Sequence, residues 1–316
     1  MQKNGQAKSQ KVRSIKQQLT YAVRQSVAIG QSKHADKGLG KNGIRHDGRS
    51  YSYKALQGRL DTAKNFAGFL QREYPEIRKA VDIKAEHINA FLTEKAATVT
   101  NDTLRTYASN LRAITKEIEN CYHANLHIKK NDIVTPSVER EPWRTCAMDA
   151  KDIAKLHDSY KSGSIGDRAL ILSHATGARA EEICTIRRED IQIKGNEAEV
   201  KIKGKGGRTR IVNVKDSSEI EKLNRIRCET PPGGRICPIK VDSLHRNIER
   251  HMKSVGIKEQ YKYTSVHAMR KEWAQRTYDS YRSNHSKLQT IKYTNEQLGH
   301  GADRDVVLLE RYCNVH

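Results

Sequence analysis

The chain has few acidic residues for its number of basic ones, and few aromatic residues. Its 316 residues include 37 Asp and Glu against 58 Lys and Arg, which gives a formal net charge of +21 at pH 7. Aromatic side chains make up 6% of the residues and hydrophobic side chains 36%, so we expect a modest core and a large polar surface. A charge of this size favours a polyanionic partner, with DNA or RNA first. The alternative is a merely basic soluble protein.

Long apolar runs and closely spaced cysteines are both missing. No run of about 18 apolar residues occurs, which argues against a membrane-spanning helix and a membrane partner. The six cysteines form no C-x-x-C pair, so the sequence indicates neither a zinc ribbon nor a compact disulfide scaffold. Free thiols are typical of a reducing compartment, and we expect a cytoplasmic, nucleoid-associated bacterial protein without a metal site.

Composition divides the chain into a basic arm and two domains. Residues 1–50 hold eleven Lys and Arg against two acidic residues and are rich in Gly, which predicts a flexible N-terminal arm. A helix around residues 11–29 is compatible with this segment. Residues 51–130 form a first domain, and residues 131–148, with two prolines and few apolar side chains, read as a linker. The second domain spans residues 149–316.

The spacing of apolar residues predicts an α+β fold that is mainly helical. In the first domain apolar residues recur every three or four positions, as at Leu104, Tyr107 and Leu111, which predicts about four helices. In the second domain helical patterns surround residues 191–214, where the period changes to two and Gly-rich turns separate the segments. We expect a small three-stranded antiparallel sheet there.

Two basic residues of the second domain have positions suited to binding phosphate. Arg179 comes two residues after Gly177 at a predicted helix start, where the N-terminus attracts anions and the guanidinium adds a planar fork. Pairing of this arginine with Glu181 or Glu182 is the alternative. Lys205 lies in a Gly-rich turn between two predicted strands, where glycines let the backbone pass close to a ligand. The alternative is an ordinary solvated basic turn.

Four more polar residues follow toward the end of the chain. His267 and Arg270 are three residues apart, so they share one face of a predicted helix. His300 follows Leu-Gly, and Tyr312 follows an apolar run. A phenol is a weak nucleophile unless neighbouring cations stabilise its anion, so Tyr312 is a candidate only together with other groups.

These motifs, taken in order, resemble those of the tyrosine recombinases, the phage-integrase family. The segment ATGARAEEICTIRREDI resembles the first arginine box of the family, IKGKGGRTRIVNV its β-hairpin lysine box, HAMR its H-x-x-R motif, and LGH with the later RY its last box. The resemblance covers roughly residues 51–316. It implies a helical core-binding domain and a catalytic domain that close around duplex DNA as a two-lobed clamp.

The resemblance also implies an activity and a set of site residues. It implies a site-specific DNA recombinase that cleaves and rejoins DNA through a 3′-phosphotyrosine intermediate, with no cofactor, metal or ATP. The implied catalytic residues are Arg179, Lys205, His267, Arg270, His300 and Tyr312, with Glu182 bracing Arg179. Tyr312 would be the nucleophile, and Lys205 would protonate the leaving 5′ oxygen.

The implied partners are recombination sites in double-stranded DNA, a Holliday junction, a homo-tetramer on DNA, and accessory DNA-bending or directionality proteins. The expected DNA contacts are Arg105, Arg112, Lys203, Arg208 and Arg210, and a solvated surface stripe is the alternative for the first two. The basic arm favours the integrase of a mobile genetic element. The competing functions are a non-cleaving DNA-binding regulator on the same fold, a relaxing topoisomerase, and a chromosome or plasmid dimer resolvase.

The sequence departs from the family pattern after the H-x-x-R motif and before the tyrosine. Lys271 and Glu272 stand where the family often has a histidine and a small hydroxyl residue. The interval from His300 to Tyr312 is a few residues longer than usual, which predicts an extended loop ahead of the nucleophile.

Overall fold

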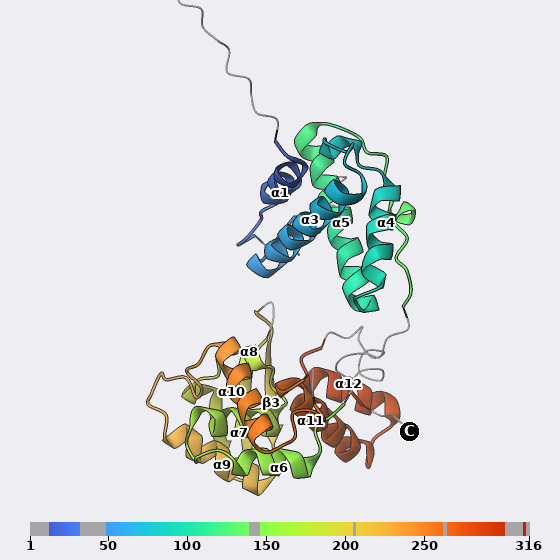
Figure 1. Cartoon of the computed structure of the whole chain (residues 1–316). Helices are drawn as coiled ribbons and strands as arrows, with labels where there is room; N and C mark the ends of the chain where they lie inside the picture. Colours follow the sequence, from blue (N-terminus) through green and yellow to red (C-terminus); the bar gives the residue numbers. More distant parts are fainter. Residues whose placement is uncertain are drawn as a thin grey trace, which may run out of the picture. The chain divides into compact units, whose positions relative to one another are not determined.

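The chain divides into two compact units, Met1–Glu141 and Pro142–His316, each with its own hydrophobic core. The computed structural model describes residues 13–31, 49–138, 146–204, 207–261, 264–300 and 312–313. Figure 1 shows the two groups of elements, mostly helices. The boundary lies inside the segment 131–148 that the sequence analysis reads as a linker.

The described part of the first unit is built from helices. They are α1 (Ile15–Gln25), α3 (Tyr53–Glu73), α4 (Ala85–Ala96) and α5 (Asn101–Tyr122), with 3₁₀ turns η2 (Ala80–Asp82) and η3 (Lys130–Asp132). Helix α5 packs against α1, α3 and α4. It buries Leu104, Ala108, Leu111 and Ile118 at intervals of three, four and seven residues, so one apolar face holds the unit together.

Helix α1 belongs to this core, which corrects part of the predicted arm. Ile15, Leu19, Ala22 and Val23 are buried in the same cluster as the side chains of α3 and α5. Their spacing of four, seven and eight residues forms an apolar stripe, and a capping box at Ser14 starts the helix. A flexible arm over residues 1–50 is therefore wrong at residues 15–25. Residues 1–12 and 32–48 lie outside the described residues.

The second unit combines helices with one small sheet. Its elements are α6 (Ala150–Asp158), α7 (Ile165–Thr176), α8 (Ala180–Ile183), η4 (Arg188–Asp190), β1 (Ile191–Lys194), β2 (Glu197–Lys203), β3 (Thr209–Val214), α9 (Ser217–Cys228), α10 (Val241–Ser254), α11 (Val266–Arg282) and α12 (Lys287–Gln297). The strands lie in the order β1-β2-β3, and both pairs are antiparallel. The predicted fold class, mainly helical with a small antiparallel sheet, is confirmed. Among the described helices, none is both long and apolar enough to cross a membrane.

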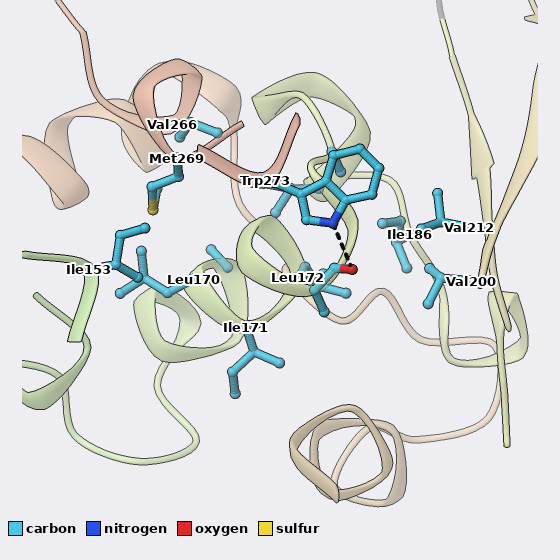
Figure 2. Close-up of a cluster of buried hydrophobic side chains, with 14 of the residues drawn as sticks. Ile153, Leu170, Ile171, Leu172, Ile186, Val200, Val212, Val266, Met269 and Trp273 are labelled. Carbon is cyan, nitrogen blue, oxygen red and sulfur yellow. Dashed lines mark hydrogen bonds between the residues drawn. The ribbon is translucent and has the colours of Figure 1, made fainter. Parts of the chain in front are cut away.

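Helix α7 lies at the centre of the second core and ends where the candidate site begins. It packs against α9, α11 and β3, and buries Leu170 and Leu172 in the cluster drawn in Figure 2. The indole N–H of Trp273, on α11, donates to the carbonyl of Ala175 at 3.2 Å, the bond dashed in Figure 2. Gly177 then ends α7 with a φ of +58°. A Cβ at this glycine would lie 2.4 Å from the Trp273 ring, so the ring fits only against a residue without a side chain.

We expect Gly177→Ala to lower the free energy of unfolding of the second unit by about 2–4 kcal/mol. About 1–2 kcal/mol comes from the left-handed backbone and the rest from displacement of Trp273. Gly195→Ala is the matched control, because Gly195 has the same φ of +58° and open space around its Cβ position. Urea unfolding should show the control losing only the backbone part. Equal losses in the two variants would contradict the steric argument.

Candidate active site

The site begins at the turn between α7 and α8, which holds Arg179. Arg179 is the N-cap residue of α8, and its backbone N–H donates to Glu182 Oε2 at 2.8 Å. Its side chain is about one-third exposed, and Nη1 donates to Glu182 Oε1 at 2.9 Å. The predicted pairing with Glu182 and the predicted place at a helix start therefore occur together. A one-third exposed guanidinium beside a helix N-terminus can still bind an anion.

Arg270 on α11 contacts the same turn from the interior of the second unit. It is 1% exposed, and its Nη1 donates to the carbonyl of Gly177, two residues before Arg179. Its Nη2 donates to the carbonyl of Leu298 at 2.6 Å, just before His300. Burial, and then the charge of Arg179, lower the pKa of Arg270 to about 10. Both guanidinium groups thus border one region of the second unit, and with a pKa of about 10 Arg270 keeps its positive charge at neutral pH.

The ring of Tyr312 lies between two histidines and near the buried arginine. Its centroid is 5.4 Å from that of His267 and 5.1 Å from that of His300, both in edge-on geometry. The guanidinium carbon of Arg270 lies 5.8 Å from the same ring centroid. Cys313, the next residue, is 3% exposed and packs in the core of this unit. The structure therefore brings three residues of the predicted set, His267, Arg270 and His300, together around the ring of Tyr312, and these four residues are the tyrosine cluster.

Asn295 orients His300 and is not among the residues predicted from the sequence. The backbone N–H of His300 donates to the Asn295 carbonyl at 2.9 Å, and His300 Nδ1 lies 3.2 Å from Asn295 Oδ1. The imidazole is thus held from its Nδ1 side by a residue that is 3% exposed. An Asn five residues before a His in a helical pattern is too common to be recognised as a signal.

Glu182 links the first arginine box to the hairpin that carries the lysine box. Arg210, on β3, donates from Nη1 to Glu182 Oε1 at 2.9 Å and from Nη2 to Glu182 Oε2 at 2.8 Å. The Arg210 side chain is 9% exposed, and the DNA contact expected at this position stays a prediction. Burial alone would raise the pKa of Glu182, but hydrogen bonds and charge from Arg210, the backbone N–H of Arg179 and the charge of Arg270 lower it to about 2.

We expect Glu182→Gln to remove a stabilising contribution on the order of 3 kcal/mol at pH 7. The native pKa is depressed to about 2, so this contribution is complete above the pKa of the unfolded chain, about 4.3, and is lost as pH falls through 2. Urea unfolding at pH 7, 4 and 3 measures it, and the gap between wild type and variant should narrow with acid. The exposed neighbour gives the control, Glu181→Gln, with no such effect. A gap that stays constant with pH would argue against this account.

The remaining predicted site residues are Lys205 and four of the expected DNA contacts. Lys205 falls outside the described residues, so its role stays a prediction. Lys203 and Arg208 flank it and are exposed. In the first unit Arg105 is 73% exposed beside Asp102, whereas Arg112 is half-buried. Arg112 Nε is buried without a hydrogen-bond partner among the described residues.

Comparison with known proteins places the chain in a family. The model of the phage integrase family matches residues 146–300, and the model described as phage integrase, N-terminal, matches residues 42–119. The chain belongs to the phage integrase family, the tyrosine recombinases. The family model matches the unit that contains Arg179, Arg270 and His300.

Solved structures of tyrosine recombinases share the fold. The XerH site-specific recombinase bound to palindromic difH, a post-cleavage complex, has a TM-score of 0.65 at 16% identity over 96% of this chain and 91% of that one. The lambda integrase tetramer bound to a Holliday junction has a TM-score of 0.58 at 17% identity over 90% and 78%. A lambda integrase dimer bound to a COC′ core site gives 0.59 at 18% over 88% and 93%. At these identities the likeness establishes the fold.

Proposed function

We propose that this tyrosine recombinase is a site-specific DNA recombinase that cleaves and rejoins DNA through a 3′-phosphotyrosine bond at Tyr312. The observation that carries the proposal is the Tyr312 ring between His267 and His300, with the Arg270 guanidinium 5.8 Å from the ring centroid. A phenol surrounded by imidazoles and a buried cation has groups that can accept its proton and stabilise its anion.

The reaction follows from the charges around that ring. The Tyr312 oxygen attacks the scissile phosphorus, the phosphotyrosyl bond forms, and the bond to the 5′ oxygen breaks. Lys205, by the family resemblance, gives that oxygen its proton, and His267 accepts the phenol proton. One phosphodiester is exchanged for another, so ATP is not needed, and rejoining is the reverse attack by a 5′ hydroxyl.

Arg179 and Arg270 neutralise the charge that builds on the non-bridging oxygens in the transition state, the role that a metal ion has elsewhere. A guanidinium carries five N–H donors. Arg270 uses Nη1 and Nη2 for backbone carbonyls, and its Nε is buried without a hydrogen-bond partner within the described ranges. For Arg179, only Nη1 bonds to Glu182 through its side chain. Counting only contacts within the described part of the chain, both residues therefore have donors left for a phosphate.

Duplex DNA is the proposed partner, with the two units closing around it as a clamp and four protomers meeting at a Holliday junction. The exposed cations Arg105, Lys203 and Arg208 supply contacts to phosphates, so affinity should fall steeply with salt. The +21 charge supports this partner. We propose that the chain is the integrase of a mobile genetic element and that DNA-bending or directionality proteins assist its reaction.

Covalent capture tests the proposal. Nicked duplexes with a randomised core lose the short cleaved fragment, so the attacking protein stays attached to the DNA. Denaturation, isolation of the adducts and sequencing of the trapped strands should yield a defined site. Tight binding with no adduct would support the non-cleaving regulator, and relaxation of supercoils without strand exchange would support a topoisomerase.

A further inference from the structure

The strand pattern places Arg210 on the buried face of the sheet. Arg210 pairs with Ile202 across the β2–β3 ladder, next to the pair Val212 and Val200. Ile202, Val200 and Val212 are all buried, because side chains two residues apart on a strand share a face. Ile211, on the other face, is 50% exposed. The guanidinium of Arg210 is therefore directed into the protein and away from the solvent side of the hairpin.

The guanidinium holds both oxygens of one carboxylate. Its two terminal nitrogens donate to the two Glu182 oxygens at 2.9 and 2.8 Å, the fork geometry that arginine makes and lysine cannot. The same carboxylate receives the backbone N–H and Nη1 of Arg179. Arg210 and Arg179 thus share Glu182 as a common anchor, although 31 positions separate them in the chain.

Arg210 also lies against the LGH segment, which belongs to the last of the four boxes. A Cβ built at Gly299 would lie 2.9 Å from Arg210 Nη1, so the guanidinium packs on the backbone just before His300. Gly299 has a φ of +65°, which favours glycine there independently. One side chain on β3 therefore touches the anchor of Arg179 and the backbone that leads into His300.

The charges explain what this contact can do. Three guanidinium groups, those of Arg179, Arg210 and Arg270, act on one carboxylate, Glu182, in this part of the unit. Without Arg210 the buried carboxylate would have Arg179 as its main partner, and a closed pair would draw that guanidinium away from a ligand. With Arg210 in place, Arg179 Nε and Nη2 bond to no group in the described part of the chain.

We propose that Arg210 is a positioning residue, which acts by occupying both oxygens of Glu182 so that Arg179 presents Nε and Nη2, which bond to no described group, to the scissile phosphate. This inference rests on the proposed function, because it concerns the same site. It replaces the DNA contact that the sequence predicts at this position.

The test compares cleavage rates at saturating DNA, using the duplex that the wild-type chain cleaves in the capture experiment. We expect Arg210→Lys and Arg210→Ala to slow single-turnover cleavage by roughly 10²-fold, because Arg179 is no longer held in position for the scissile phosphate. DNA affinity should stay within about threefold. The double variant Arg179→Ala with Arg210→Ala should be no slower than Arg179→Ala alone, because both changes remove one effect. Arg227→Ala, a half-buried arginine on α9, is the control for loss of an arginine.

The outcomes separate this inference from the proposed function. A wild-type chain that forms no adduct refutes the function. If the wild type cleaves, wild-type rates for Arg210→Lys refute the inference, and so does a double variant slower than Arg179→Ala by the full factor of Arg210→Ala. Weakened DNA binding of the Arg210 variants with normal cleavage at saturating DNA would refute the inference and support the DNA contact that the sequence predicts at Arg210. If Arg210→Ala fails to fold, Arg210→Lys and Arg179→Ala with Arg210→Lys carry the same comparison.

Discussion

Replacing Tyr312 by Phe should abolish the covalent protein–DNA adduct, a loss of roughly 10⁴-fold or more in cleavage rate. The change removes one oxygen atom, the attacking nucleophile in the proposed reaction, and keeps the ring that packs edge-on against His267 and His300. The fold and the affinity for duplex DNA should therefore remain. Denaturing gels with a nicked, labelled duplex measure the adduct, and gel-shift titration measures the affinity.

Tyr281→Phe is the control for loss of a phenol oxygen in the same unit. Tyr281 lies on α11 and stacks on His285 and Tyr293, away from the tyrosine cluster, so its variant should cleave like the wild type. An adduct that survives in Tyr312→Phe would show that another group attacks the phosphorus. The proposed mechanism would then be wrong, even with the family assignment intact.

Replacing Arg270 by Lys should slow cleavage by roughly 10²–10³-fold at saturating DNA. Lysine keeps the charge but cannot hold the carbonyls of Gly177 and Leu298 and also leave a fixed donor for the phosphate. Burial and the charge of Arg179 lower the pKa of Arg270 to about 10, so the site already disfavours a cation at this position. A lysine, which has fewer N–H donors, would stabilise its charge there less well. Single-turnover quench experiments measure the rate.

Arg282→Lys is the matched control, because Arg282 ends the same helix and is exposed. Thermal unfolding must be recorded alongside, since each carbonyl that loses its donor costs about 1–3 kcal/mol. A folded Arg270→Lys protein that cleaves at the wild-type rate would remove Arg270 from the catalytic machinery. It would leave this residue the structural role of joining α7 to α12.

Much of the architecture could be predicted from the sequence. Periodicity alone identified the helical first unit and the three strands, because side-chain burial repeats every 3.6 residues on a helix and every two on a strand. The order of the motifs then indicated the tyrosine recombinase family. The prediction of a flexible arm is wrong at residues 15–25, where many cations surround an apolar stripe of Ile15, Leu19, Ala22 and Val23. The residues on α3 and α5 that bury this stripe are distant in the chain, so the local composition does not reveal them.

The sequence by itself determined which residue types the site contains and the order in which they come: an arginine after a helix-ending glycine, a histidine–arginine pair on one helix face, and a late tyrosine. Only the tertiary structure decided how they meet. Proximity between Arg270, Gly177 and Leu298 depends on α7, α11 and α12 packing around one core, and no local pattern encodes that. Arg210 shows both kinds of information in one residue. Its place beside Val212 on the buried face follows from a two-residue period, but its bond to Glu182 requires two separate motifs to come together in one folded unit.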